Sequence, residues 1–298
     1  MPDTLIMTER SVRDQLAVYD AIVIGAGISG MYMLYRLREL GMTARVFEAG
    51  TNVGGTWYWN RYPGARFDSE SWTYGYSFSK ELMREWDWKE HFSPQPDTLE
   101  YLNYVADKFD LRRDIHFRST VAAAHWDEAA NRWNVTLESG QRANSRFLFT
   151  AIGILSAYTL PAIPGRDSFK GPAYHPARWP HTPVDFTGKR VGIVGTGATA
   201  IQVIPEIAKH AKHLTVFQRR PNWAAPLHNS KISKGEMEEI KSRYEEIYAH
   251  CATTPSWFIH QADPRKTLEV PPEEREAFWE SFTASPALAS GWATFAIS

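Results

Sequence analysis

The sequence contains little cysteine: among its 298 residues, Cys251 alone carries a thiol. One cysteine cannot form a disulfide within the chain or a CxxC redox pair, and such scarcity is typical of proteins in a reducing compartment. The first residues, MPDTLIMTERSVRD, mix acidic and basic side chains and contain no apolar core of a signal peptide. The sequence therefore predicts a cytoplasmic protein.

An excess of charge of either sign is also absent. Lys and Arg number 33, Asp and Glu number 34, and the formal net charge is −1. The two signs alternate along most of the chain, whereas a nucleic-acid-binding protein usually has a basic excess or a one-sided basic patch. We therefore expect no nucleic-acid partner.

Membrane spans and several common catalytic motifs are missing too. Residues 16–35 are apolar, but Asp20 and three glycines interrupt them, so we expect no membrane partner. There is no GxSxG or P-loop motif, and because His210 and His213 have no evident third ligand, no metal site is expected. A hydrophobic content of 43% permits a sizeable core, and the length favours two domains.

A strand, a glycine turn, a helix and a second strand follow one another near the N-terminus. Residues 16–24 form an apolar, β-branched run, residues 25–30 read GAGISG, and helical spacing continues to Gly41. In a βαβ unit of this kind, GxGxxG lets a pyrophosphate approach the turn and the helix N-terminus. Glu48, 18 residues beyond Gly30, is placed to accept from ribose hydroxyls. Dinucleotide binding is favoured over a purely structural turn.

A second unit of the same order lies about half a chain later. A strand at 190–194 leads into GTGATA at 195–200, then a helix and a strand at 214–217. The motif allows alanine as its third small residue. Gln218, Arg219 and Arg220 stand where the first unit has its acid, and arginine can pair with a ribose 2′-phosphate. This site is expected to prefer NADP over NAD; the alternative is a solvated arginine pair.

Two unlike nucleotide sites on one chain suggest FAD together with NADPH, because a flavin accepts a hydride and passes electrons onward. Disulfide reductases with such sites need a cysteine pair, which this chain does not have. Oxygen is then the natural electron acceptor.

The remaining sequence predicts an α/β fold with two Rossmann-like dinucleotide-binding domains. Short strands at 115–117, 121–126, 133–137 and 146–149 indicate an antiparallel β insertion, and the sequence beyond about residue 229 has amphipathic helical spacing. We expect an FAD-binding domain at 1–153, a linker at 154–186 and an incomplete NADP-binding domain at 187–298.

Two longer stretches are specific enough to indicate a family. Residues 54–68, GGTWYWNRYPGARFD, resemble the GGxWxxxxYPGxxxD stretch of the Baeyer–Villiger monooxygenases, and the resemblance is closest to the phenylacetone monooxygenase branch. Residues 169–180, FKGPAYHPARWP, resemble that family's fingerprint FxGxxxHxxxWP. Trp179 is discriminating, because the related nitrogen- and sulfur-oxidising flavin monooxygenases usually have Tyr or Phe there.

The resemblance implies a set of cofactor-binding residues. FAD would be bound by Gly25, Gly27, Ser29, Gly30, Glu48, Thr56, Trp57, Tyr58, Trp59, Asp68, Tyr74 and Val121. NADP would be bound by Arg66, Thr196, Gly197, Ala198, Thr199, Ala200, Ile201, Gln202, Arg219 and Arg220. The fingerprint residues Phe169, Gly171, His175 and Trp179 would couple NADPH binding to domain motion. Asp68 would have the catalytic role of positioning a family arginine that lies beyond this sequence.

The implied activity is an NADPH- and O2-dependent insertion of oxygen next to a ketone carbonyl, through a C4a-peroxyflavin, to give an ester or lactone. Two alternatives stay open: a flavin monooxygenase that oxidises nitrogen or sulfur, and a catalytically silent FAD/NADP-binding remnant. Family members are much longer, so the chain, which stops at Ser298 within the expected helical insertion, is expected to be a fragment or a truncated copy.

Overall fold

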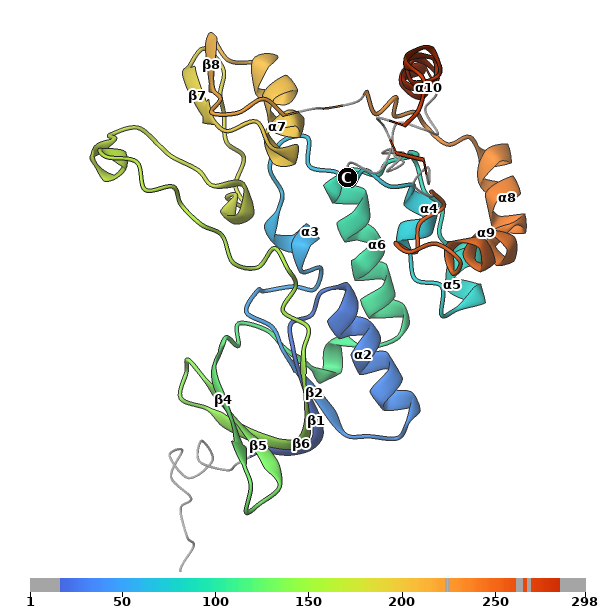
Figure 1. Cartoon of the computed structure of the whole chain (residues 1–298). Helices are drawn as coiled ribbons and strands as arrows, with labels where there is room; N and C mark the ends of the chain where they lie inside the picture. Colours follow the sequence, from blue (N-terminus) through green and yellow to red (C-terminus); the bar gives the residue numbers. More distant parts are fainter. Residues whose placement is uncertain (1–16, 223, 225, 261–264, 267–268, 285–298) are drawn as a thin grey trace, which may run out of the picture. The chain divides into compact units, whose positions relative to one another are not determined.

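The computed structural model describes residues 17–222, 224, 226–260, 265–266 and 269–284 (Figure 1). The chain divides into two compact units, each made of two separate segments. Unit 1 comprises Met1–Arg61 and Leu99–Pro180, and unit 2 comprises Tyr62–Thr98 and His181–Ser298.

Unit 1 is built on a six-stranded mixed sheet whose strand order is β3-β2-β1-β6-β5-β4. The strands are β1 (Ala17–Ile24), β2 (Ala44–Phe47), β3 (Ile115–His116), β4 (Val121–Asp127), β5 (Arg132–Leu137) and β6 (Arg142–Thr150). Strands β3, β2, β1 and β6 run parallel, while β5 is antiparallel to both β4 and β6. The antiparallel insertion predicted from the sequence is therefore present at β4 and β5, but the prediction was wrong for β3 and for residues 146–149 of β6, which pair in parallel with β2 and β1 because they extend the sheet of the first βαβ unit.

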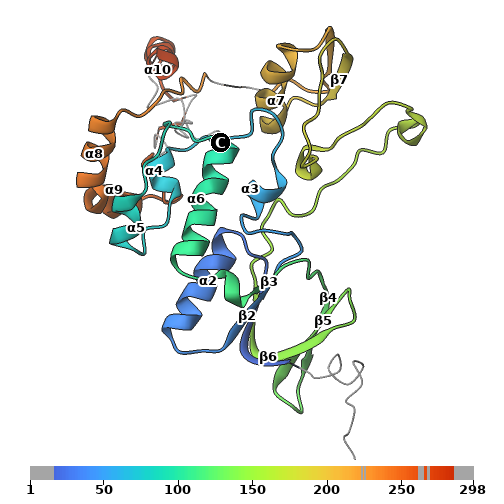
Figure 2. The ribbon, with the colours of Figure 1, turned by 180° about the vertical axis from the view of Figure 1, so that it is seen from behind.

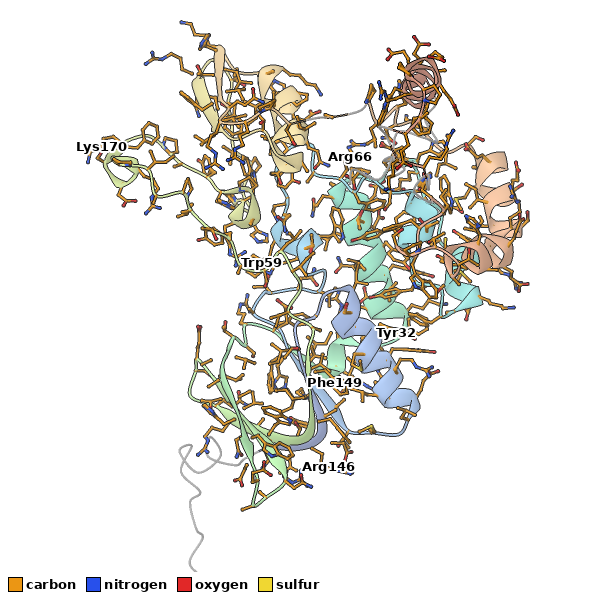
Figure 3. All side chains as sticks on the ribbon, in the orientation of Figure 1. Tyr32, Trp59, Arg66, Arg146, Phe149 and Lys170 are labelled. Carbon is orange, nitrogen blue, oxygen red and sulfur yellow. The ribbon has the colours of Figure 1, made fainter. Side chains whose placement is uncertain are left out.

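The first strand and helix of unit 1 form its core because their apolar residues face each other. Ala21, Ile22 and Val23 of β1 are completely buried. Helix α2 (Ile28–Glu39) packs along β1 and β2 (Figure 2), and buries Met31 and Leu34. Tyr32, labelled in Figure 3, lies on the outer side and is 40% exposed. The predicted first βαβ unit is confirmed, although Leu16 lies outside the described residues.

The last strand of unit 1 begins four residues earlier than the sequence predicted. Strand β6 starts at Arg142 and pairs in parallel with β1 from Ala17, which lies opposite Ala143. The start of the strand contains polar residues and was therefore not predicted. Its side chains nevertheless alternate between exposed and buried as in a strand: Ala143 and Ser145 are buried while Arg142 is exposed. The Ser145 hydroxyl donates a hydrogen bond to the Phe147 carbonyl at 2.7 Å.

Unit 1 also holds short helical elements. They are α3 (Thr56–Trp59), η1 (Arg112–Asp114), η2 (Arg166–Ser168) and η3 (Pro176–Arg178). Helix α6 (Gln95–Lys108) buries Tyr101, Leu102, Val105 and Ala106.

Unit 2 contains the second strand, glycine turn, helix and strand. Strands β7 (Arg190–Val194) and β8 (His213–Phe217) pair in parallel, and α7 (Ala198–Ala208) connects them. Helix α7 buries Val203 and Ile207. The predicted second βαβ unit, and with it the α/β class with two Rossmann-like units, is confirmed.

The remaining elements of unit 2 are helices, of which those beyond residue 229 were predicted by their amphipathic spacing and the two before residue 98 were not. They are α4 (Ser71–Tyr74), α5 (Lys80–Glu85), α8 (Lys234–Ser242), α9 (Tyr244–Cys251) and α10 (Pro272–Ala284). Helix α8 begins with a capping box between Ser233 and Glu236. The expected continuation of the helical segment to Ser298 lies outside the described residues beyond 284. Within the described part of the chain, no helix is both long and apolar enough to cross a membrane.

Candidate nucleotide-binding sites

The first glycine turn is so closely packed that its glycines cannot be replaced. A Cβ at Gly25, where φ is +99°, would lie 2.6 Å from the Ala151 carbonyl oxygen, and one at Gly30 would lie 1.8 Å from the Gly25 oxygen. Gly27 is the N-cap of α2, and no side chain among the described residues caps it. A helix N-terminus without a side-chain cap can receive an anion.

The second glycine pair, Gly54 and Gly55, lies directly against this turn. The Gly54 N–H donates to the Ala26 carbonyl at 3.0 Å. A Cβ at Gly55 would lie 2.8 Å from Gly27 Cα, so only glycine allows the two backbones this approach. The Gly54-Gly55 stretch and the GxGxxG turn, which the sequence places 24 residues apart, therefore form one backbone surface.

Glu48 lies beneath the same turn and is 5% exposed. Its Oε2 accepts from the Ala26 N–H at 2.7 Å and its Oε1 accepts from the Gly50 N–H at 2.6 Å. Because a carboxylate oxygen has two acceptor positions, each oxygen can still accept from a ribose hydroxyl. Glu48 thus orders the glycine turn in addition to its predicted role.

The aromatic residues of α3 follow the glycine pair. Trp57 and Tyr58 are each 6% exposed, and the Tyr58 hydroxyl is 2.7 Å from the Thr51 hydroxyl. Trp59 packs edge-on against Tyr58, with ring centroids 4.8 Å apart, and remains half-buried. Thr56, the first residue of this helix, is half-buried as well.

The four remaining predicted FAD residues have surroundings that differ from those of the residues above. Ser29 is exposed on the first turn of α2. Val121 packs on the core cluster of the sheet. Asp68, which is exposed, and Tyr74, which stacks on Phe67 at 4.2 Å, belong to unit 2. Their role at a flavin stays a prediction.

The second glycine turn is held by the segment that follows β8. Gly195, with φ +102°, donates its N–H to the Phe217 carbonyl at 2.9 Å. Gln218 donates to the Thr196 hydroxyl at 3.3 Å, and the Asn222 side chain donates to the Thr196 carbonyl at 2.8 Å. The sequence analysis did not identify Asn222, and its only signal is its place two residues after the arginine pair.

The N-terminus of α7 is open to an anion in the same way as that of α2. Gly197 is its N-cap, and within the described residues no side chain caps it. Arg219 and Arg220 are exposed, and in the described part of the chain neither forms an ion pair with a carboxylate. Both guanidinium groups are therefore available to a phosphate.

The loop at residues 62–66 contacts α7 through Gln202. The Gln202 Oε1 accepts from the Tyr62 hydroxyl at 2.9 Å and from the Arg66 N–H at 3.4 Å, while its Nε2 donates to the Arg66 carbonyl at 2.9 Å. Burial raises the pKa of Tyr62, and a hydrogen bond from the Thr199 hydroxyl opposes that shift. Arg66, labelled in Figure 3, directs its guanidinium to Glu90 at 3.3 Å. The sequence analysis included Tyr62 in the stretch at residues 54–68 but did not predict its contact with Gln202.

The fingerprint residues of unit 1 contact nearby residues of the linker. The His175 Nδ1 accepts from the Ala177 N–H at 3.2 Å, and its ring lies 4.7 Å from that of Tyr158. Burial, together with the positive charge of Arg178, lowers the pKa of His175. The ring centroid of Trp179 lies 5.5 Å from that of Tyr174. Phe169 is 66% exposed, and a Cβ at Gly171 would lie 2.6 Å from its ring.

Arg178 joins the fingerprint to the aromatic residues of α3, a contact that sequence reasoning did not find. Its guanidinium carbon lies 4.9 Å from the ring centroid of Trp59, labelled in Figure 3, and 5.0 Å from that of Tyr158. The same guanidinium donates to the Ser156 carbonyl at 2.9 Å. A cation between two aromatic rings holds the linker at Trp59.

Comparison with known proteins decides the family. Residues 19–240, about three quarters of the chain, match the model of the flavin-binding monooxygenase-like proteins. The chain belongs to this family.

Relatives within the family agree with the expected resemblance to Baeyer–Villiger monooxygenases. The chain is 46% identical over 282 residues to 2-oxo-Δ3-4,5,5-trimethylcyclopentenylacetyl-CoA monooxygenase of Pseudomonas putida, covering 93% of this chain and 52% of that protein. It is 44% identical over 268 residues to a Baeyer–Villiger monooxygenase of Pseudooceanicola batsensis, covering 89% and 49%. A crystal structure of OTEMO in complex with FAD and NADP is 45% identical, with a TM-score of 0.88, covering 94% of this chain and 53% of that one. The chain spans about half the length of these relatives.

Proposed function

We propose that this chain forms the FAD- and NADP-binding part of an NADPH- and O2-dependent monooxygenase that inserts oxygen next to a ketone carbonyl to give an ester or lactone. The observation that carries the proposal is the pair of uncapped helix N-termini, α2 and α7, each preceded by a strand and a glycine turn. Relatives named as Baeyer–Villiger monooxygenases support the choice of reaction.

The residues of unit 1 fit FAD. A Cβ at Gly55 would lie 2.8 Å from Gly27 Cα, so glycine at this position lets the two backbones form a surface that a pyrophosphate would approach, and Glu48 lies within reach of the ribose that would follow. The aromatic helix α3 would flank the flavin, while Ser29, Asp68, Tyr74 and Val121 are retained as proposed contacts. We retain 1–153 as the proposed FAD-binding domain.

The residues of unit 2 fit NADP. The N-terminus of α7, with residues 196–201, would take the pyrophosphate, and Arg219 and Arg220 would pair with the 2′-phosphate. The proposed NADP-binding domain is 187–298, connected by the linker 154–186. Arg66 lies on the loop that contacts α7 and is proposed to face the nicotinamide side of the nucleotide.

The bound cofactors would supply the redox chemistry, and the protein would position them and exclude water. When bound, FAD supplies the hydride acceptor and the electrons for oxygen activation, and NADPH supplies the hydride. The buried rings of Trp57 and Tyr58 would keep water from the flavin side of the pocket. Asp68, exposed in unit 2, is proposed to orient an arginine toward the developing negative charge on the ketone oxygen. The proposed substrates are a ketone and O2, in the cytoplasm.

The visible absorption spectrum of the purified protein tests the cofactor part of this proposal. We expect a flavin band that NADPH bleaches under nitrogen and that returns in air. A protein without the band after reconstitution with FAD would be the silent remnant. If NADPH leaves the flavin band unchanged, the proposed NADP site in unit 2 is wrong.

Product analysis tests the reaction. With a panel of cyclic and linear ketones, esters or lactones containing one atom from ¹⁸O2 are expected. Amine and sulfide substrates serve as the comparison. Formation of N- or S-oxides without any ester from ketones would replace the proposed reaction by heteroatom oxidation.

A further inference from the structure

The side chain of Gln202 is held by the loop at residues 62–66. Its amide oxygen accepts from the Tyr62 hydroxyl and from the Arg66 N–H, and one of the two N–H groups of its amide nitrogen donates to the Arg66 carbonyl. Because both ends of the amide are engaged, a rotation of the side chain toward a nucleotide would break these three hydrogen bonds. The sequence predicted a nucleotide contact for this residue, whereas its partners all belong to the loop.

The loop backbone also lies directly on the helix. Gly64 has φ +81°, and a Cβ there would lie 2.4 Å from the Gln202 carbonyl oxygen. The Tyr62 hydroxyl bonds to Thr199 as well as to Gln202, and these two residues are three apart and so share one face of α7. Loop and helix therefore touch through the backbone and through two side chains.

Beyond Arg66 the loop is fixed to a neighbouring segment of unit 2. The Gln95 N–H donates to the Ala65 carbonyl at 2.8 Å, and Arg66 forms a β-bridge with Pro94. The Arg66 guanidinium donates to the Phe92 carbonyl at 3.2 Å. Asp68 follows two residues later, so a shift at Arg66 is transmitted to it along a short, well-packed stretch.

Helix α7 connects Gln202 to the second glycine turn. Its N-cap is Gly197, and Gln202 lies five residues further, less than two turns along the same helix. A change in the order of the glycine turn therefore reaches Gln202 through a continuous run of helical hydrogen bonds.

We propose that Gln202 and Tyr62 are positioning residues that couple occupancy of the second glycine turn by the phosphates of NADP to the placement of residues 66–68. The inference rests on the proposed function, since it takes NADP to be the ligand of this turn. In this role Gln202 supports the loop and does not itself hold the nucleotide.

Amide hydrogen exchange of the flavin-loaded protein, with and without NADP⁺, tests the coupling. In the unaltered protein NADP⁺ is expected to slow exchange in a peptide covering residues 62–68. Gln202→Met removes all three side-chain bonds of Gln202, Gln202→Glu keeps the acceptor for Tyr62 but loses the donor to Arg66, and Tyr62→Phe removes the bond to Gln202 together with the interaction with Thr199. We expect the NADP⁺-dependent protection to be lost in Gln202→Met and reduced in the other two.

Matched controls make the same chemical changes elsewhere. Tyr35→Phe removes a hydroxyl that bonds to Glu39 within α2, and Gln141→Met alters an exposed turn. Both controls should keep the full protection. The double variant Tyr62→Phe with Gln202→Met should lose the protection as fully as Gln202→Met alone, because the bond between Tyr62 and Gln202 is already absent in the single variant.

Titration of NADP⁺ against each variant separates support of the loop from direct binding. The coupling predicts that Gln202→Met changes the affinity by less than about threefold, whereas loss of a direct contact to a charged group costs about tenfold or more. A large loss of affinity would overturn the inference, as would protection that persists in Gln202→Met. If the unaltered protein binds NADP⁺ without protecting the loop, only the coupling fails. If it does not bind NADP⁺, the proposed function fails and the coupling fails with it.

Discussion

Replacing Gly30 by alanine tests whether the contact between α2 and the first glycine turn holds the nucleotide site together. Gly30 is a buried residue of α2, and helical propensity alone predicts that alanine would stabilise the chain by up to about 1 kcal/mol. The structure predicts the opposite, because the new Cβ would lie 1.8 Å from the Gly25 carbonyl oxygen, and real Cβ contacts below 3.0 Å essentially do not occur. Helix and turn would have to separate by more than about 1 Å.

The cost can be bounded. Overpacking of movable side chains costs about 1–3 kcal/mol, and since the obstacle here is backbone, the upper end applies. Subtracting the propensity gain leaves a loss of about 2 kcal/mol, which corresponds to a melting temperature lower by roughly 4–8 °C. The moved turn should also bind FAD less well.

Thermal unfolding and the flavin content per chain measure both effects. Gly235→Ala is the matched control, because Gly235 also lies in a helix, α8, but a Cβ there would meet nothing within 4 Å. That variant should melt at the same temperature as the unaltered protein or slightly higher, with its flavin intact. A Gly30→Ala protein that melts no lower than the unaltered one and keeps its flavin would refute the steric reasoning.

Three further changes should have specific effects. Glu48→Gln replaces one of two acceptor oxygens by an amide group that faces a backbone N–H, so unfolding should become easier by about 1–3 kcal/mol and the flavin content should fall in absorbance measurements. Replacing Arg219 and Arg220 together by alanine should lower the preference for NADPH over NADH about tenfold, measured as the ratio of kcat/KM values; an unchanged ratio would show that the pair is only solvated. The lowered pKa of His175 means that folding favours the neutral ring. The contribution of this ring to the free energy of unfolding is therefore present above the unfolded pKa near 6.5 and is lost as the pH falls through the lower folded pKa. Protonation would oppose the bond from the Ala177 N–H, and we expect an acid-induced change in tryptophan fluorescence that His175→Asn removes; the same transition in that variant would assign it to another group.

Local chemistry explains why much of the fold could be predicted from the sequence. The glycine turns, the strands before them and the helices after them follow from φ values open to glycine, from β-branched runs and from helical spacing, all within about 25 residues. The start of β6 was missed because polar Arg142 and Asn144 alternate with buried small residues, a weaker signal than an apolar run.

The long-range contacts could not be predicted in the same way. Tyr62 and Gln202 are 140 residues apart, and no spacing rule relates a hydroxyl in one motif to an amide in another. Arg178 occupies a variable position of the fingerprint, and its place beside Trp59 depends on how the linker folds back onto α3. Such contacts depend on the tertiary packing, which a pattern of residue types does not contain.

The interleaving of the two units along the chain has a consequence for synthesis. Neither unit is continuous: residues 62–98 belong with a segment that begins at His181, and residues 99–180 lie between them in sequence. At a translation rate of about 5–20 residues per second, residues 62–98 wait roughly 4–16 s before the ribosome has made the start of their partner segment. During this interval residues 62–98, which include the buried side chains of Phe67, Leu82 and Trp88, lack the part of unit 2 that begins at His181, so co-translational chaperone binding should concentrate on this stretch.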